Sequence, residues 1–206
     1  MTTGEKEWIA TIGMFLDLEF NTMATNIHKV FVSYHHTTPD QQYRDAFEKL
    51  FAVQHEIMVS QSVQIGDINL LFNADRVRQK IRDEYIRDAT VTVVLIGKLT
   101  WQRKHVDWEI SSSIRDTALN PRCGLLGIFL PSYPLTPPNN FNHKTIPPRL
   151  YDNWKNDKNR FAHLYNWSTD PMLVQSWIHK AFQERNTIIP DNSFDHFGQN
   201  RTANEW

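Results

Sequence analysis

The sequence predicts an α/β fold in which helices cover both faces of a central parallel sheet. Two patterns alternate along the chain: short apolar runs, typical of buried parallel strands, and segments with apolar residues every three or four positions, typical of helices. The run Val91–Gly97 (VTVVLIG) is uncharged and rich in β-branched residues, which favours an interior strand. Hydrophobic residues form 40% of the 206 positions, enough for a buried core, which argues against a chain that is disordered throughout.

The other elements follow from the same two patterns. Further strands are predicted at residues 30–34, 56–63, 125–130 and 161–167. Helices are predicted at about 43–51, 75–88, 101–118 and 171–182. Because strands and helices alternate, we expect the strands to pair in parallel and the helices to pack on the sheet between them.

We expect one domain, spanning residues 28–189, with a segment of different character on each side. Residues 1–27 are predicted to form an N-terminal extension, and residues 190–206 a polar C-terminal tail outside the domain. Within the domain, residues 131–160 hold six of the ten prolines and six asparagines, so they are predicted to form a long excursion.

Charge and composition narrow the function classes. Lys and Arg number 22 against 23 Asp and Glu, a net charge of −1, so a nucleic-acid partner and an anionic membrane surface are both disfavoured. No stretch approaches the roughly 20 apolar residues of a membrane span, and we expect a cytoplasmic protein. The single cysteine, Cys123, excludes an internal disulfide and a cysteine-rich zinc site.

Several common catalytic and nucleotide-binding motifs are absent from the sequence. It contains no G-x-G-x-x-G, no P-loop, no G-x-S-x-G and no H-E-x-x-H. An ordinary Rossmann enzyme, a P-loop NTPase and an α/β-hydrolase are therefore disfavoured. We expect neither a bound metal nor a resident cofactor.

Candidate ligand-binding residues lie where predicted strands end, because ligands of parallel sheets bind at the carboxyl ends of the strands. The first strand ends in a polar and aromatic run, and the central strand is soon followed by a tryptophan. These positions are Ser33, Tyr34, His35, His36 and Trp101. The indole of Trp101 either stacks on an aromatic ring of a ligand or packs against another segment.

Glu109 lies on the predicted helix that follows the central strand. At about 100° per residue, Val106 and Ile110 fall on the face toward the sheet, and Glu109 lies about 60° to the side of Val106. His105 is one turn earlier on the same flank. From the helical wheel alone, Glu109 is either a boundary glutamate in a surface ion pair or a carboxylate whose head group reaches a cleft.

Four segments carry a resemblance to a known family, over about residues 29–167. They are VFVSYHH, VTVVLIGKLTWQRKHVDWEI, GLLGIFLP and IPPRLYDNW. Together they resemble the TIR-like family, and more closely the TIR-like proteins of the Thoeris anti-phage systems. The resemblance implies a flavodoxin-like three-layer sandwich with a central parallel sheet. The family's catalytic glutamate falls on Glu109. Combined with the rule that ligands bind at strand ends, this position predicts a substrate site formed by Glu109, the strand-end residues and His105.

For function, the resemblance implies an enzyme that breaks the bond between nicotinamide and ribose in NAD⁺, which is then a substrate and not a cofactor. The product would be a cyclic or modified ADP-ribose that activates a separate effector protein in anti-phage defence. Two other interpretations remain open: a non-catalytic TIR-like interaction module, and a flavodoxin-like receiver or nucleotide binder. Homo-oligomerisation also remains open.

Overall fold

The computed structural model describes residues 27–62, 74–117, 120–137 and 140–206. Nearly all of the predicted N-terminal extension, residues 1–26, lies outside the described residues. Every strand and helix predicted from the sequence has a counterpart among the described residues, although several begin or end at other positions.

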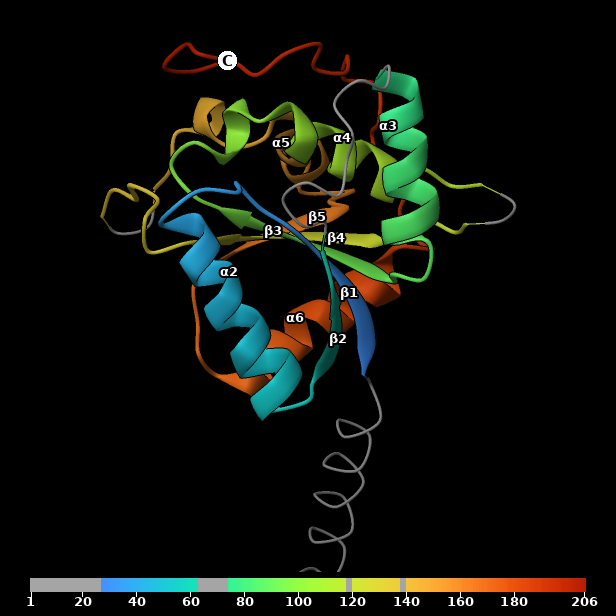
Figure 1. The fold of residues 1–206 in the computed structure, drawn as a ribbon, viewed down its shortest axis with the longest axis vertical. Coiled ribbons are helices and arrows are strands. Elements are labelled where there is room, and N and C mark those ends of the chain that lie inside the picture. Colours follow the sequence, from blue (N-terminus) through green and yellow to red (C-terminus); the bar gives the residue numbers. More distant parts are fainter. Residues whose placement is uncertain (1–26, 63–73, 118–119, 138–139) are drawn as a thin grey trace, which may run out of the picture.

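Five strands form one sheet in which all neighbours are parallel, in the order β2-β1-β3-β4-β5 (Figure 1). The strands are β1 (His28–Ser33), β2 (Met58–Gln61), β3 (Val91–Ile96), β4 (Gly124–Phe129) and β5 (Ala162–Asn166). This strand order is that of flavodoxin-like folds. The central position of β3, whose six residues are all buried, confirms the prediction of an interior strand.

Helices cover both faces of the sheet, which confirms the predicted three-layer architecture (Figure 1). One face carries α2 (Asp40–Glu48), which continues as a π-helical segment, Lys49–Gln54, and α6 (Pro171–Glu184). The other face carries α3 (Ala74–Lys80) with a π-helical continuation, Ile81–Ile86, and also α4 (Lys104–Ser113) and α5 (Pro148–Trp154).

The helix after the central strand is shorter than the sequence predicted. Residues Thr100–Gln102 form a separate 3₁₀ turn, so Trp101 is not part of α4. At the other end, α4 stops at Ser113, whose hydroxyl donates to the carbonyl of Ile110. Serine hydroxyls that bond to nearby backbone groups compete with the helical pattern, which favours an end to the helix here.

The proline-rich excursion contains a helix that the sequence did not reveal. Helix α5 begins at Pro148, directly after Pro147. Proline is favoured at the first position of a helix, because it needs no hydrogen-bond partner there and its φ angle already fits. A proline-rich segment can therefore carry a helix as well as a loop.

The segment predicted as a polar tail packs on the domain, which corrects the prediction that residues 190–206 lie outside it. It has no regular secondary structure, and it runs along α4 and α5 (Figure 1). The backbone carbonyl of Phe197 accepts a hydrogen bond from Trp108 Nε1 at 2.9 Å, and that of Phe194 accepts one from Arg149 Nη2 at 2.6 Å. These contacts bury both partner side chains.

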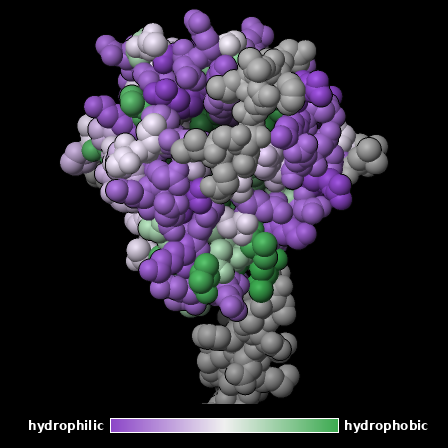
Figure 2. Space-filling view, viewed as in Figure 1, coloured by the Kyte–Doolittle hydropathy of each residue, from purple (hydrophilic) through white to green (hydrophobic). Residues whose placement is uncertain are grey.

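The face in Figure 2 is largely hydrophilic, with only small apolar areas. Among the described residues, no helix is both long enough and apolar enough to cross a membrane.

Candidate active site

Glu109 is buried beside the end of the first strand. The side chain projects from α4 toward the sheet, the residue is only 1% exposed, and Oε2 accepts a hydrogen bond of 2.5 Å from Ser33 Oγ. Ser33 is the last residue of β1, so the bond joins the edge of the sheet to the helix. The helical wheel placed Glu109 at the margin of the helix face that packs on the sheet. The structure buries all eight residues from Val106 to Ser113, because another segment covers the outer side of α4.

Burial determines the protonation of Glu109. Removal from water raises the pKa of the carboxyl to about 8, and the hydrogen bond from Ser33 only partly opposes this increase. At pH 7 the carboxyl is therefore mainly neutral in this conformation. A nearby cation would lower its pKa again, because it would favour the charged form.

The histidines predicted for the site lie near the start of α4. Burial is the main reason why the pKa of His35 and that of His36 both fall to about 4. Arg103 further lowers the pKa of His35, and His105 that of His36, so the end of β1 and the start of α4 act on one another electrostatically. These histidines are neutral at pH 7.

The ring of His105 also has a nitrogen without a hydrogen-bond partner among the described residues. Its Nδ1 is buried and has no hydrogen-bond partner among the residues that the structure describes, and the same holds for Arg103 Nε. Burial lowers the pKa of His105, so its ring is mainly neutral at pH 7. Two unpaired nitrogens therefore lie at the start of the helix that carries Glu109. Among the described residues, no group of three or more His, Cys, Asp or Glu could hold a metal ion.

Tyr34 was predicted to contact the substrate, but the structure places it on the opposite face of the sheet from Glu109. Successive residues of a strand point to opposite faces, so Ser33 faces α4 and Tyr34 faces α2. The tyrosine is 2% exposed; its hydroxyl donates to Gln41 Oε1 at 2.8 Å and accepts from Arg44 Nη2 at 3.1 Å. Tyr34 therefore belongs to the core around α2, and its ring packs against His36.

Trp101, also predicted to contact the substrate, is buried. Its 3₁₀ turn leaves only 2% of the residue exposed, so the indole has no open face on which a base could stack in this conformation. Trp108, on the outer side of α4, is 3% exposed, and the C-terminal segment covers it. For both indoles, packing against other segments of the chain is the role that the structure describes.

Asp40 joins the ends of three strands, although no pattern in the sequence singles it out. At the start of α2, it is 3% exposed and accepts hydrogen bonds from Ser132 Oγ, beyond β4, at 3.0 Å and from Thr100 Oγ1, beyond β3, at 3.4 Å. His35 Nδ1, beyond β1, lies 3.9 Å from its Oδ2. Burial raises the pKa of Asp40.

Gly97, at the end of the central strand, leaves space for the carboxylate of Asp40. A Cβ atom at position 97 would lie 2.0 Å from Asp40 Oδ2, far inside contact distance. The Gly97 N–H donates to Thr100 Oγ1 at 2.8 Å, and that hydroxyl in turn donates to Asp40. The absence of a side chain at Gly97 therefore lets the carboxylate of Asp40 close over the end of the central strand.

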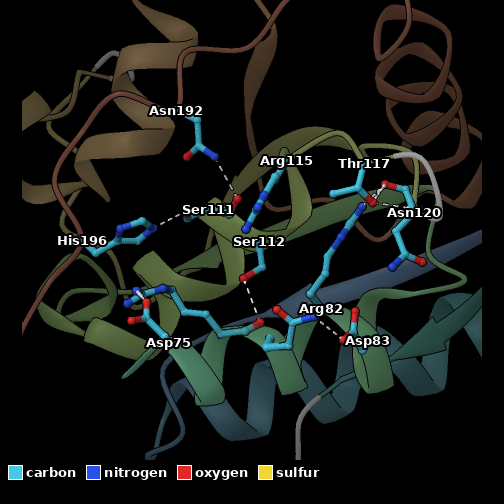
Figure 3. A pocket seen from close by; sticks show the side chains of 12 residues that line it. Asp75, Arg82, Asp83, Ser111, Ser112, Arg115, Thr117, Asn120, Asn192 and His196 are labelled. Carbon is cyan, nitrogen blue, oxygen red and sulfur yellow. Dashed lines mark hydrogen bonds and ion pairs between the residues drawn. The ribbon is translucent and has the colours of Figure 1, made fainter. Parts of the chain in front are cut away.

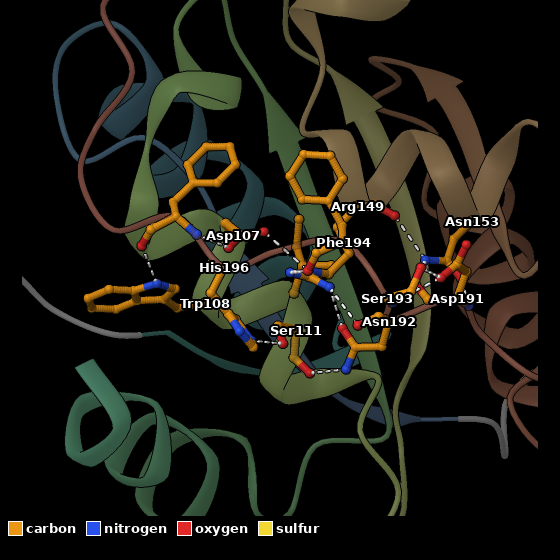
Figure 4. A network of polar contacts seen from close by, with 12 residues as sticks. Asp107, Trp108, Ser111, Arg149, Asn153, Asp191, Asn192, Ser193, Phe194 and His196 are labelled. Atoms are coloured by element: carbon orange, nitrogen blue, oxygen red, sulfur yellow. Dashed lines mark hydrogen bonds and ion pairs between the residues drawn. The ribbon is translucent and has the colours of Figure 1, made fainter. Parts of the chain in front are cut away.

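A buried ion pair holds α4 in place (Figure 4). Arg149, on α5, is 0% exposed, and its Nε donates to Asp107 Oδ1 at 3.1 Å. The remaining guanidinium donors reach the C-terminal segment, through Asn192 Oδ1 at 2.7 Å and the carbonyl of Phe194. The backbone N–H of Phe197 completes the network by donating to Asp107 Oδ2 at 3.0 Å. Since Asp107 precedes Glu109 by two residues, this network fixes the helix that carries the candidate catalytic carboxyl.

Comparison with known proteins identifies the family and agrees with the fold described above. A family model described as the Thoeris protein ThsB, TIR-like domain, matches residues 31–133, which is half of the chain. The match begins within β1, includes Glu109 and extends past β4. A comparison with curated proteins found no match. The chain therefore belongs to the TIR-like domain family of the Thoeris protein ThsB.

Proposed function

We propose that this protein is an NAD⁺-cleaving enzyme of anti-phage defence, which releases nicotinamide and makes a cyclic or modified ADP-ribose. The observation that carries the proposal is the position of Glu109, a buried carboxyl at the carboxyl end of a parallel sheet. Ligands of such sheets bind at that edge. Membership of the Thoeris TIR-like family supports both the reaction and its biological setting.

One carboxylate is sufficient for this chemistry. When the bond between C1′ of the ribose and the nicotinamide nitrogen breaks, its electron pair leaves with nicotinamide, and the ribose becomes an oxocarbenium-like cation. The nicotinamide ring of NAD⁺ is already cationic, so it departs as a neutral molecule and needs no acid. The remaining task is to stabilise positive charge on the ribose, which an ionised Glu109 would do.

The raised pKa of Glu109 suggests how the site is activated. In the described conformation the carboxyl is mainly neutral at pH 7, with a pKa of about 8. A bound NAD⁺ would bring the positive nicotinamide ring close to the carboxyl and shift it toward the charged form. Because Glu109 is only 1% exposed, substrate would reach it only after neighbouring side chains move.

The nature of the product depends on which nucleophile meets the ribose cation. Attack by water gives ADP-ribose, whereas attack by a hydroxyl or a ring nitrogen of the same nucleotide gives a cyclic product. A site that closes around its substrate favours the second outcome, since it excludes water. The nucleotide would then diffuse to a separate effector protein and activate it in the cytoplasm of the infected cell. Neither a nucleic acid nor a membrane takes part in the proposed reaction.

The test compares three forms of the protein in cells infected with phage: the wild type, Glu109→Gln, and Glu84→Gln, a matched control at an exposed position of the π-helical segment that follows α3. Chromatography of the lysates should show loss of NAD⁺ and a new ADP-ribose-type nucleotide with the wild type and the control. Glu109→Gln should reduce product formation by on the order of 10²–10³, because it removes the charge that faces the ribose cation. Wild-type levels of product with Glu109→Gln would contradict the proposal.

The alternative is a non-catalytic interaction module, and one observation favours it. Glu109 is neutral and hydrogen-bonded in a closed environment, as a purely structural residue would be. In that case infected cells would contain no new nucleotide with either the wild type or the control, and Glu109→Gln would change only stability.

A further inference from the structure

A pocket beside the C-terminal end of α4 has the features of an anion site. Its volume is about 750 Å³, and it lies between α3 with its π-helical continuation, the end of α4 and the C-terminal segment (Figure 3). Neither Glu109 nor any other residue predicted for the active site lines it. Its size is in the range of pockets that bind small molecules.

Three arginines line this pocket: Arg78 and Arg82, one turn apart on α3 and its π-helical continuation, and Arg115, just beyond the end of α4. Arg78 is paired with Asp75 at the outer edge. Arg115 is exposed, and the described residues offer it no ion pair. The second acid of the pocket, Asp83, already accepts a hydrogen bond from Gln79 Nε2 at 2.7 Å. The arginines therefore outnumber the two acids that line the pocket.

Arg82 is the strongest sign of a missing partner. The residue is 6% exposed, and its Nη2 donates to the carbonyls of Asn120 and Pro121. Its Nε and Nη1 are buried and have no hydrogen-bond partner among the described residues. Burying such donors without an acceptor is unfavourable, and it is more so for a charged group.

The surroundings of Arg82 do not balance its charge. The adjacent Cys123 thiol is neutral at pH 7, because burial raises its pKa to about 11. Burial is the main reason why the pKa of Arg82 is lowered, and the nearby Arg115 adds to the effect, whereas Cys123, Asp83 and Asp116 only partly oppose it. An anion between Arg82 and Arg115 would relieve both the burial penalty and the repulsion.

Hydroxyl groups in the same pocket provide further donors. Ser112 Oγ donates to the carbonyl of Arg78 over 3.4 Å, a weak bond that it can exchange for a better acceptor. Ser111 Oγ lies 2.7 Å from His196 Nε2, and Thr117 also lines the pocket. Guanidinium forks combined with hydroxyl donors match the tetrahedral oxygens of a phosphate group.

We propose that this pocket binds a phosphate-bearing small molecule, held by Arg82 and Arg115 with Ser112 as an additional donor. The site is separate from the proposed NAD⁺ site, so the two proposals can fail independently. The ligand would contact α4 one turn beyond Glu109, as well as the C-terminal segment through His196. It would therefore stabilise the packing of the helix that carries the candidate catalytic carboxyl.

The test is isothermal titration calorimetry of the full chain with inorganic pyrophosphate and with orthophosphate. Pyrophosphate should bind more tightly, because its two phosphate groups can engage both arginines. Arg115→Met should weaken pyrophosphate binding by roughly ten- to hundredfold, since it removes charge-assisted hydrogen bonds from an exposed residue without disturbing the core. Arg87→Met, a change of an exposed arginine outside the pocket, should leave the affinity unchanged.

Arg82→Lys provides a second test, because it keeps the charge but removes the guanidinium fork. It should also weaken binding by at least tenfold while the protein remains folded by circular dichroism. No measurable binding of pyrophosphate to the wild type would overturn the proposal. Equal affinities for the wild type, Arg115→Met and Arg82→Lys would overturn it as well, since the anion would then bind elsewhere.

Discussion

Ser33 and Glu109 lie 76 residues apart in the chain, yet a 2.5 Å hydrogen bond joins the hydroxyl of one to the carboxyl of the other. The bond links the carboxyl end of β1 to the helix that follows the central strand. It therefore ties the candidate catalytic group to the sheet edge where a ligand would bind.

Glu109→Gln should change the pH dependence of stability. The pKa of Glu109 is raised in the folded protein, to about 8 from an ordinary value of 4.5, so the folded state holds the proton more tightly than the unfolded state. The stability due to this proton is fully present below pH 4.5 and is lost as pH rises through 8. Urea denaturation at pH 5, 7 and 9 should show that the free energy of unfolding of Glu109→Gln increases relative to that of the wild type as pH rises. The relative increase should be on the order of a few kcal/mol at the highest pH. If the free energies of unfolding of the two proteins changed with pH in parallel, the carboxyl of Glu109 would not be desolvated.

Ser33→Ala should destabilise the protein and make Glu109 harder to ionise. The change removes the donor that lowers the pKa of Glu109, so that pKa should rise further. The free energy of unfolding should fall by about 1 kcal/mol, as expected for one hydrogen bond. Product formation should fall as well, if the charged form of Glu109 is the active one. Ser176→Ala, at an exposed helical position, is the matched control and should have little effect on either measurement.

Arg149→Met should be among the most destabilising single changes in the protein. It leaves the carboxylate of Asp107 buried without its cation and removes the donors that hold the C-terminal segment. Loss of one partner of a buried ion pair costs about 3–5 kcal/mol. Urea denaturation should also show that adding Asp107→Asn to Arg149→Met restores part of the lost free energy of unfolding, because the buried carboxylate is then neutral.

The control for Arg149 is Lys155→Met, which breaks a solvent-accessible ion pair at the C-terminal end of α5. Lys155 is 48% exposed and pairs with Asp152 at 2.6 Å, so its loss should cost less than about 1 kcal/mol. Equal effects of the two changes would contradict the structural role assigned to Arg149.

Gly97→Ala should disrupt the contact between the central strand and Asp40. The new Cβ would lie 2.0 Å from Asp40 Oδ2, so the carboxylate and its hydrogen bonds must move. Overpacking of this kind costs typically about 1–3 kcal/mol. In thermal denaturation, Gly198→Ala should be close to neutral, because a Cβ there would meet no atom within 4 Å. A second change, Asp40→Ala, should relieve the clash but forfeit the hydrogen bonds from Ser132 and Thr100.

The order of strands and helices could be predicted from the sequence because it depends on local periodicity. Val91–Ile96 is the clearest case: an uncharged, β-branched strand has to be buried on both faces, and it occupies the centre of the sheet. The placement of Glu109 on the helix after this strand was predictable for the same reason. Helix α5 was missed because Pro147 and Pro148 indicate a loop as readily as a helix start.

The candidate site was only partly predictable, since it depends on contacts between distant segments. Alternation along β1 separates Ser33 from Tyr34, but the sequence does not say which face α4 covers. Asp40 could not be recognised either, because its partners Thr100 and Ser132 lie on loops far along the chain.

The sequence by itself determined the α/β architecture, the interior position of the central strand and the place of Glu109 on the next helix, because each follows from hydrophobic patterning within one segment. Tertiary structure alone decided the environment of that glutamate. The helical wheel left its head group at a boundary, and a segment nearly ninety residues further along, held through Phe197 and Arg149, covers the outer side of α4. Exposure and pKa depend on everything that surrounds a side chain, so a pattern within one helix cannot determine them.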